Sequence, residues 1–199
     1  EQVLSRIPVK NISDKYVYSL EGITQSFISM VWSLPDTASA KEELSIRIGI
    51  MILGGVSRNR IYKRLREDLG YVYDVSMSVS GEEDPLRIIR FDSSTSESNV
   101  SSLIDESLDI IQKFVEDGPT KNELERAINQ FIFKIKRSVL NEKQFLDLVV
   151  SMTRFSTHKI AAQEYVEISE TMTIQDVHNA VKNILSQKPS IIITNPKII

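Results

Sequence analysis

Two short stretches near the start of the chain, 16–20 and 25–34, are interpreted as strands, and in the second the residues alternate between two faces. A repeat of two residues predicts β-strands, because neighbouring side chains of a strand point to opposite faces. In the second stretch one face is wholly apolar: Ile28, Met30, Trp32 and Leu34. The other face is mixed: Phe27, Ser29, Val31 and Ser33. We therefore expect the apolar face to lie under helices, and Pro35 to close the strand.

Between Ser39 and Gly54 the apolar residues follow a helical period instead. They recur at Leu44, Ile48, Met51 and Ile52. This spacing predicts a helix with a wide buried stripe, which we expect Gly54 and Gly55 to end. Ser57 is then in position to cap a second helix that reaches about Leu69.

The clearest alternation runs from Tyr71 to Ser80. One side carries Tyr71, Tyr73, Val75, Met77 and Val79, and the other carries Asp74, Ser76, Ser78 and Ser80. This pattern predicts a strand. The turn-like stretch 81–85 separates it from another strand, Leu86 to about Ser94, so the two are expected to form an antiparallel hairpin.

The rest of the chain has mostly helical periodicity. We expect helices at 100–118, 120–139, 145–155 and 173–185, and a closing strand at Ser190–Thr194. Thr120 with Glu123, and Thr173 with Asp176, have the spacing of capping boxes. No linker-like segment divides the chain. We expect residues 1–199 to form one α+β domain of two layers, with a mostly antiparallel sheet covered by helices on one side.

Composition excludes several classes of function. The net charge of −3 argues against a general nucleic-acid binder, and no apolar run approaches the roughly 18 residues that span a bilayer. The absence of cysteine excludes disulfides, thiolate metal sites and a cysteine nucleophile. The chain opens at Glu1 and not at Met, from which we expect a processed product or a piece of a longer protein.

The two histidines of the chain do not have the spacing of zinc ligands. A zinc hydrolase places two imidazoles one helical turn apart, as in H-E-x-x-H or H-x-x-E-H. His158 and His178 are the two histidines, and neither has a ligand-type residue four positions later. We interpret both as surface or half-buried helix residues, and expect no metal and no cofactor to bind this chain.

One segment, 57–73, is unusually basic. Its five cationic side chains are Arg58, Arg60, Lys63, Arg64 and Arg66. They are compatible with a solvated helix face. Alternatively, Arg66 and Tyr73 meet at the corner between helix and strand, where a guanidinium and a phenol can donate hydrogen bonds to a peptide carbonyl and its developing oxyanion. A nucleic-acid patch is the third interpretation, and the acidic total and lack of interleaved aromatic residues disfavour it.

The same segment resembles a signature of the pitrilysin/insulinase family of zinc metallopeptidases. The resemblance rests on Gly54-Gly55, Arg60-Ile61-Tyr62, Leu65-Arg66-Glu67, Gly70 and Tyr73-Asp74-Val75. Further landmarks of that family occur in the same order at Gln25, 119–127 and 172–177. Together they span most of the chain.

The resemblance implies a clamshell of homologous αβ domains, in which one domain carries zinc and the facing domain lacks it. Arg66 and Tyr73 match the arginine and tyrosine with which the facing domain holds the substrate backbone. No residue matches the zinc ligands or the general base. The resemblance thus implies a C-terminal-type domain that is inactive alone. Its implied partners are a peptide substrate and a zinc-bearing N-terminal-type domain, which lies either in the same chain or in a companion subunit. The alternative is a non-catalytic scaffold of the same family. A bacterial periplasm or cell envelope is the compartment we expect.

The orientation of Tyr73 stays open at this point. Strict alternation places it with Val75 and Met77, on the side expected to face the core. A bulge or bend at the start of the strand would turn it outward instead.

Overall fold

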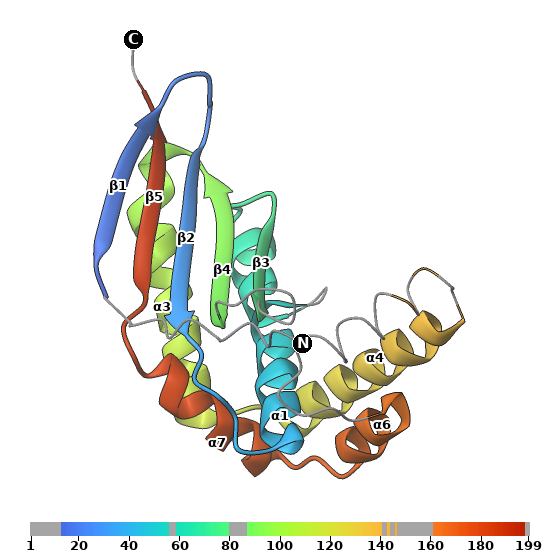
Figure 1. Cartoon of the computed structure of the whole chain (residues 1–199). Coiled ribbons are helices and arrows are strands. Elements are labelled where there is room, and N and C mark those ends of the chain that lie inside the picture. The colour runs from blue at the N-terminus through green and yellow to red at the C-terminus, as the bar shows by residue number, and fades with distance from the viewer. Residues whose placement is uncertain are drawn as a thin grey trace, which may run out of the picture.

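The computed structural model describes residues 13–55, 59–79, 87–140, 143, 146 and 161–197 (Figure 1). Five strands form one mixed sheet in the order β1-β5-β2-β4-β3. They are β1 (Lys15–Leu20), β2 (Ser26–Ser33), β3 (Val75–Val79), β4 (Ile88–Thr95) and β5 (Ser190–Pro196). β1 is parallel to β5, and every other neighbouring pair is antiparallel. The predicted α+β class and mostly antiparallel sheet are confirmed.

Helices account for most of the remaining described residues. They are α1 (Ala40–Ile50), α2 (Arg60–Tyr62), α3 (Val100–Asp117), α4 (Lys121–Val139), α6 (Ala162–Glu170) and α7 (Ile174–Leu185). Shorter turns are the π-helical η1 (Met51–Gly55) and η2 (Lys63–Asp68), and the 3-10 turn η3 (Glu97–Asn99). The helix α6 was not predicted. Of the helix predicted at 145–155 only residue 146 is described, and it is helical; the rest lies outside the described residues.

The helices α1, α3 and α7 lie on one side of the sheet, whereas α4 extends away from it beside α6 (Figure 1). The apolar face of β2 confirms the prediction, since Ile28, Met30 and Trp32 are at most 1% exposed. On the opposite face Phe27 is 50% exposed. Burial of a large apolar side chain contributes about 1.5–3 kcal/mol, so the closed face is the main source of stability and the open face is available for contacts.

Both predicted capping boxes are present. The Thr120 side chain accepts from the amide of Glu123, whose carboxylate accepts from the amide of Thr120 in return. Thr173 and Asp176 do the same at the start of α7. These caps satisfy amides that have no partner within the helix.

Two expected boundaries are wrong. The second helix is capped by Asn59, whose side chain accepts from the amide of Tyr62, and not by Ser57. The strand β3 begins at Val75 and not at Tyr71. The first helix ends at Gly54 and Gly55 as expected, but its last residues form the π turn η1. A Cβ on Gly54 would be 2.5 Å from the Cβ of Met77, so a glycine is needed there for the close approach of η1 to β3.

Candidate functional site

Arg66 contacts the rings of two tyrosines. Its guanidinium carbon is 4.9 Å from the ring centre of Tyr73 and 5.0 Å from that of Tyr62. Both distances are within the roughly 6 Å at which a cation is attracted to the face of an aromatic ring. The two residues predicted to form the site are therefore in contact, and Tyr62 is a third member that was not predicted.

The π turn η2 carries Arg66 to this position. The amide of Leu69 bonds to the carbonyl of Arg64, 3.1 Å away and five residues earlier, and Leu65 is fully buried beneath the turn. Gly70 then reverses the chain with φ of 64°, a conformation that favours glycine. Single π turns occur frequently at functional sites in helices. The apolar period alone does not distinguish such a turn from a regular helix.

Tyr73 projects outward. Its side chain is 79% exposed, while Val72 and Val75 on either side are each 6% exposed. Two exposed residues, Tyr73 and Asp74, thus separate two buried ones, where strict alternation allows only one. The chain bends at Tyr73 ahead of β3. Of the two orientations that the sequence left open, Tyr73 therefore has the outward one and does not face the core.

Two hydroxyl groups of β4 hold the bend in place. Thr95 Oγ1 donates to the carbonyl oxygen of Tyr71 at 2.6 Å, and Ser93 Oγ donates to that of Asp74 at 2.9 Å. Thr95 is 1% exposed and Ser93 is 8% exposed. These bonds tie the backbone on both sides of Tyr73 to the sheet at the point where the regular β3–β4 pairing ends.

Arg66 differs from the two other arginines of its segment that the structure describes. Arg60 binds both carboxylate oxygens of Glu123, at 2.7 and 2.8 Å, and Arg64 binds Glu106 at 3.0 Å. Arg66 has no carboxylate partner within the part of the chain that the structure describes. Its charge is therefore available to an acceptor from outside. The pairing of Arg60 and Arg64 also argues against a nucleic-acid patch, since it leaves only Lys63 and Arg66 without a carboxylate partner among the described residues; Arg58 lies outside them.

The pKa of Glu123 shows how strongly this carboxylate binds Arg60. Burial is the largest single influence and raises the pKa of this carboxyl, but hydrogen bonds from Arg60 and from the amide and hydroxyl of Thr120 together outweigh it. The net effect lowers the pKa from 4.5 to about 2. Arg60 also donates to the carbonyl of Gly118 and lies 4.9 Å from the ring centre of Phe114. Its role is to join α2 to the α3–α4 corner.

The described residues do not fit a zinc ion. His178 Nε2 is 2.8 Å from the carbonyl oxygen of Val115, and its ring packs against Gly118. This is a structural contact between α7 and the end of α3. Within the described ranges no three His, Asp or Glu residues come together as a metal site would require. His158 lies outside them. Among the helices described, none is long and apolar enough to cross a membrane.

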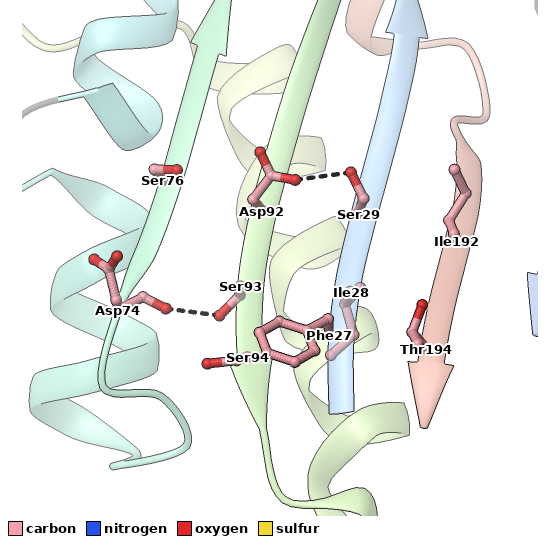
Figure 2. Close-up of a pocket in the computed structure, with 10 residues that line it drawn as sticks. All are labelled: Phe27, Ile28, Ser29, Asp74, Ser76, Asp92, Ser93, Ser94, Ile192 and Thr194. Carbon is pink, nitrogen blue, oxygen red and sulfur yellow. Dashed lines mark hydrogen bonds between the residues drawn. The ribbon is translucent and has the colours of Figure 1, made fainter. Parts of the chain in front are cut away.

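A shallow groove of about 270 Å³ crosses the open face of the sheet next to this corner (Figure 2). Its lining comes from four strands and from Asp74, the residue after Tyr73. Phe27 and Ile192 supply apolar surface, and hydroxyl groups and two carboxylates supply the polar part. Figure 2 shows the Phe27 ring beside Ser94, and the bond from Ser29 to Asp92, which is 2.8 Å long.

Comparison with known proteins identifies the family. Residues 2–131 match the family described as the peptidase M16 inactive domain. Because this match covers most of the chain, the chain belongs to that family, a group of domains from zinc-protease-like proteins. The resemblance to a C-terminal-type pitrilysin/insulinase domain is thereby confirmed. Among curated proteins no sequence matches.

Solved structures share the fold at low sequence identity. The M16 inactive-domain structure from Pseudomonas fluorescens has a TM-score of 0.73 at 17% identity, over 93% of this chain and 44% of its own. The periplasmic protease PqqL from Escherichia coli gives 0.76 at 16% identity, over 96% of this chain and 21% of its own. The inactive peptidase domain of a zinc protease from Bordetella parapertussis gives 0.72 at 12% identity, over 86% of this chain and 93% of its own. The chain thus spans less than half of the first two relatives and nearly all of the third.

Proposed function

We propose that residues 1–199 form the substrate-holding half of a zinc endopeptidase clamshell, inactive without a zinc-bearing partner domain. In this proposal Arg66 and Tyr73 hold a peptide carbonyl and stabilise the charge that develops on its oxygen. The observation that carries it is the guanidinium of Arg66, which contacts two aromatic rings beside the exposed Tyr73 and has no carboxylate partner among the described residues.

The chemistry of the two side chains supports this role. A guanidinium has five N–H donors and no acceptor, and a phenol can donate its O–H. Both can therefore donate to one carbonyl oxygen, and the interaction strengthens as that oxygen becomes an anion. The two rings restrict the arginine side chain before substrate binds, which lowers the entropy cost of ordering it.

Bond cleavage does not take place on this chain in the proposal. The described residues do not fit zinc, so activation of water belongs to the partner domain, in the same chain or in a companion subunit. This domain binds the peptide and orients its carbonyl. The likeness to the periplasmic PqqL supports a bacterial periplasm as the compartment.

Substitutions in the complete protein test the proposal. Removal of one oxyanion donor costs about 10²–10³ in rate, so Arg66→Ala and Tyr73→Phe should each lower peptide kcat/KM by about a hundredfold with zinc content unchanged. Arg64→Ala is the matched control, because Arg64 lies two residues away on the same turn and makes a surface ion pair with Glu106. It should keep the wild-type rate.

The alternative is a non-catalytic scaffold, in which this fold serves only to bind other domains. Wild-type turnover by both Arg66→Ala and Tyr73→Phe would favour that alternative. A parent protein that has no zinc-binding domain and acquires none from a companion subunit would favour it as well.

A further inference from the structure

The strand β1 is an open edge of the sheet. Among the described strands it pairs only with β5, and it lies at the opposite edge from β3 (Figure 1). All six of its residues are exposed. An unpaired edge is a template for pairing with another chain, and proteins commonly protect such edges with proline or with charged side chains along the strand. The middle of β1, Tyr16–Ser19, has neither.

The backbone of β1 has hydrogen-bonding groups that point away from the sheet. The carbonyl oxygens of Asp14 and Leu20 accept from amides in and directly after β5, at 2.8 and 3.0 Å. Because alternate residues of a parallel strand bond to the same neighbour, the even-numbered residues face β5. The odd-numbered residues Lys15, Val17 and Ser19 therefore direct their amides and carbonyls outward, where another strand can bind them.

Apolar side chains are exposed on both faces of this edge. Tyr18 and Leu20 are exposed on the open face of the sheet. Val17 is 58% exposed on the other face, although Ile193, its neighbour on β5, is only 3% exposed there. The described helices therefore do not extend over β1, and a partner strand would cover apolar surface on both sides.

The charges at the two ends of β1 favour a second copy of the chain as the partner. Lys15 begins the strand and has no carboxylate partner among the described residues, and Glu21 follows the last residue of the strand. Two antiparallel copies place each lysine opposite the glutamate of the other copy, whereas parallel copies would place like charges together. Glu21 also accepts from Lys197 of its own copy at 2.6 Å, an exposed pair that uses one of its two oxygens.

The backbone groups match in the same register. With Lys15 opposite Glu21 of the second copy, Val17 lies opposite Ser19. Both of these residues direct their amide and carbonyl outward, so they can exchange two hydrogen bonds. Each such contact occurs twice, as an interface between two identical surfaces requires.

The side chains of the open face match in this register as well. Tyr18 lies on the twofold axis, opposite Tyr18 of the second copy, and Tyr16 lies opposite Leu20. These are the pairs without mutual backbone bonds, in which opposite side chains are closest. Aromatic pairs across antiparallel strands are stabilising, so the register that joins opposite charges also joins the apolar residues.

We propose that β1 is a self-association edge, through which two copies of the chain pair antiparallel with Tyr18 on the twofold axis and form one continuous sheet. The proposal is independent of the proposed function. Because Arg66 and Tyr73 lie beside the opposite edge of the sheet, both copies keep that corner accessible.

Cysteine cross-linking in the complete protein tests the register. The chain contains no cysteine, so Tyr18→Cys adds a thiol that has no partner within it. On the axis the two Cα atoms would be about 4.5 Å apart, within the roughly 4.4–6.8 Å that a disulfide spans. Mild oxidation should therefore give a covalent dimer that reductant reverses. Tyr16→Cys is the matched control, because its two copies would be roughly 14 Å apart and should not cross-link.

Charge reversal tests the choice of partner. Lys15→Glu and Glu21→Lys should each weaken the dimer about tenfold in analytical ultracentrifugation of the complete protein, because both cross-strand pairs become repulsive. Mixed in equal amounts, the two variants should associate as tightly as wild type, since each pair again joins opposite charges. Lys197→Ala is the control, because it removes the internal bond of Glu21 and should not weaken the dimer.

Val17→Pro tests the backbone bonds. The amide of Val17 points away from β5, so proline is compatible with this edge position and removes bonds only to the second copy. The variant should keep the wild-type circular dichroism spectrum and dimerise about tenfold more weakly.

A wild-type protein that stays monomeric over the whole concentration range would overturn the proposal. So would equal cross-linking of Tyr18→Cys and Tyr16→Cys, or a failure of Lys15→Glu and Glu21→Lys to associate when mixed. The mixing experiment decides the matter even if Val17→Pro does not fold.

Discussion

The hydroxyl of Thr95 donates a hydrogen bond of 2.6 Å to the carbonyl oxygen of Tyr71. Thr95 is the last residue of β4 and is almost fully buried, whereas Tyr71 lies ahead of β3 where regular pairing has not begun. A side chain therefore replaces a backbone amide as the partner of this carbonyl. With the bond from Ser93 to Asp74, it sets the direction in which Tyr73 leaves the sheet.

Thr95→Val should test this positioning role. Valine has nearly the same shape but cannot donate, so the carbonyl of Tyr71 loses its partner at a cost of about 1–3 kcal/mol. We expect a lower free energy of unfolding in urea and, on the proposed function, a lower peptide kcat at unchanged zinc content in the complete protein. Thr95→Ser, which keeps the hydroxyl, should restore most of the rate. Equal rates for the valine and serine variants would show that the hydroxyl does not position Tyr73.

Gly54 should tolerate no side chain. A Cβ at this position would lie 2.5 Å from the Cβ of Met77 and 3.0 Å from its amide nitrogen, so η1 must move away from β3. Overpacking of this kind costs about 1–3 kcal/mol, and Gly54→Ala should show it in urea unfolding. Gly55→Ala is the control, because its nearest neighbouring atom would be 3.4 Å away. A Gly54→Ala variant as stable as the Gly55→Ala variant would contradict this packing.

The ion pair of Glu123 and Arg60 should make stability depend on pH. The pKa of Glu123 is lowered in the folded state, from 4.5 to about 2. Its contribution is therefore complete above about pH 4.5 and is lost as the pH falls towards 2. Glu123→Gln should be less stable than wild type by about 1–2 kcal/mol at pH 7, a value reduced because the pair is partly open to water.

The difference in unfolding midpoint between Glu123→Gln and wild type should shrink between pH 4.5 and pH 2. Glu125→Gln is the control, because Glu125 is exposed and its ion pair with Lys121 is long, at 3.8 Å. Its difference from wild type should be small at every pH. A Glu123→Gln difference that is the same at pH 7 and pH 3 would mean that the carboxylate charge is not what stabilises the corner.

Much of the fold could be predicted because local patterns and tertiary structure agree there. The alternation in β2 indicated a buried face, and Ile28, Met30 and Trp32 are indeed buried. The capping boxes at Thr120 and Thr173 were likewise readable, since all their partners lie within three residues.

The corner of the site could be predicted only in part. The family resemblance indicated that Arg66 and Tyr73 meet, but the direction of Tyr73 depends on hydroxyl groups of β4 some twenty residues later, which no local pattern reveals. The π turn η2 was not predicted, because the pattern of apolar residues is nearly the same whether a turn has the usual number of residues or one more. The ring of Tyr62 had a usable signal, its position four residues before Arg66.

A double-mutant cycle in the complete protein is the most direct test of the central claim, the proposal that Arg66 and Tyr73 act together on one peptide carbonyl. It compares peptide kcat/KM for wild type, Arg66→Ala, Tyr73→Phe and the double variant, all with equal zinc content. Groups that act as a unit are strongly non-additive. We predict that each single variant loses about a hundredfold and that the double variant is little slower than the slower of the two. Wild-type rates in both single variants would contradict the account.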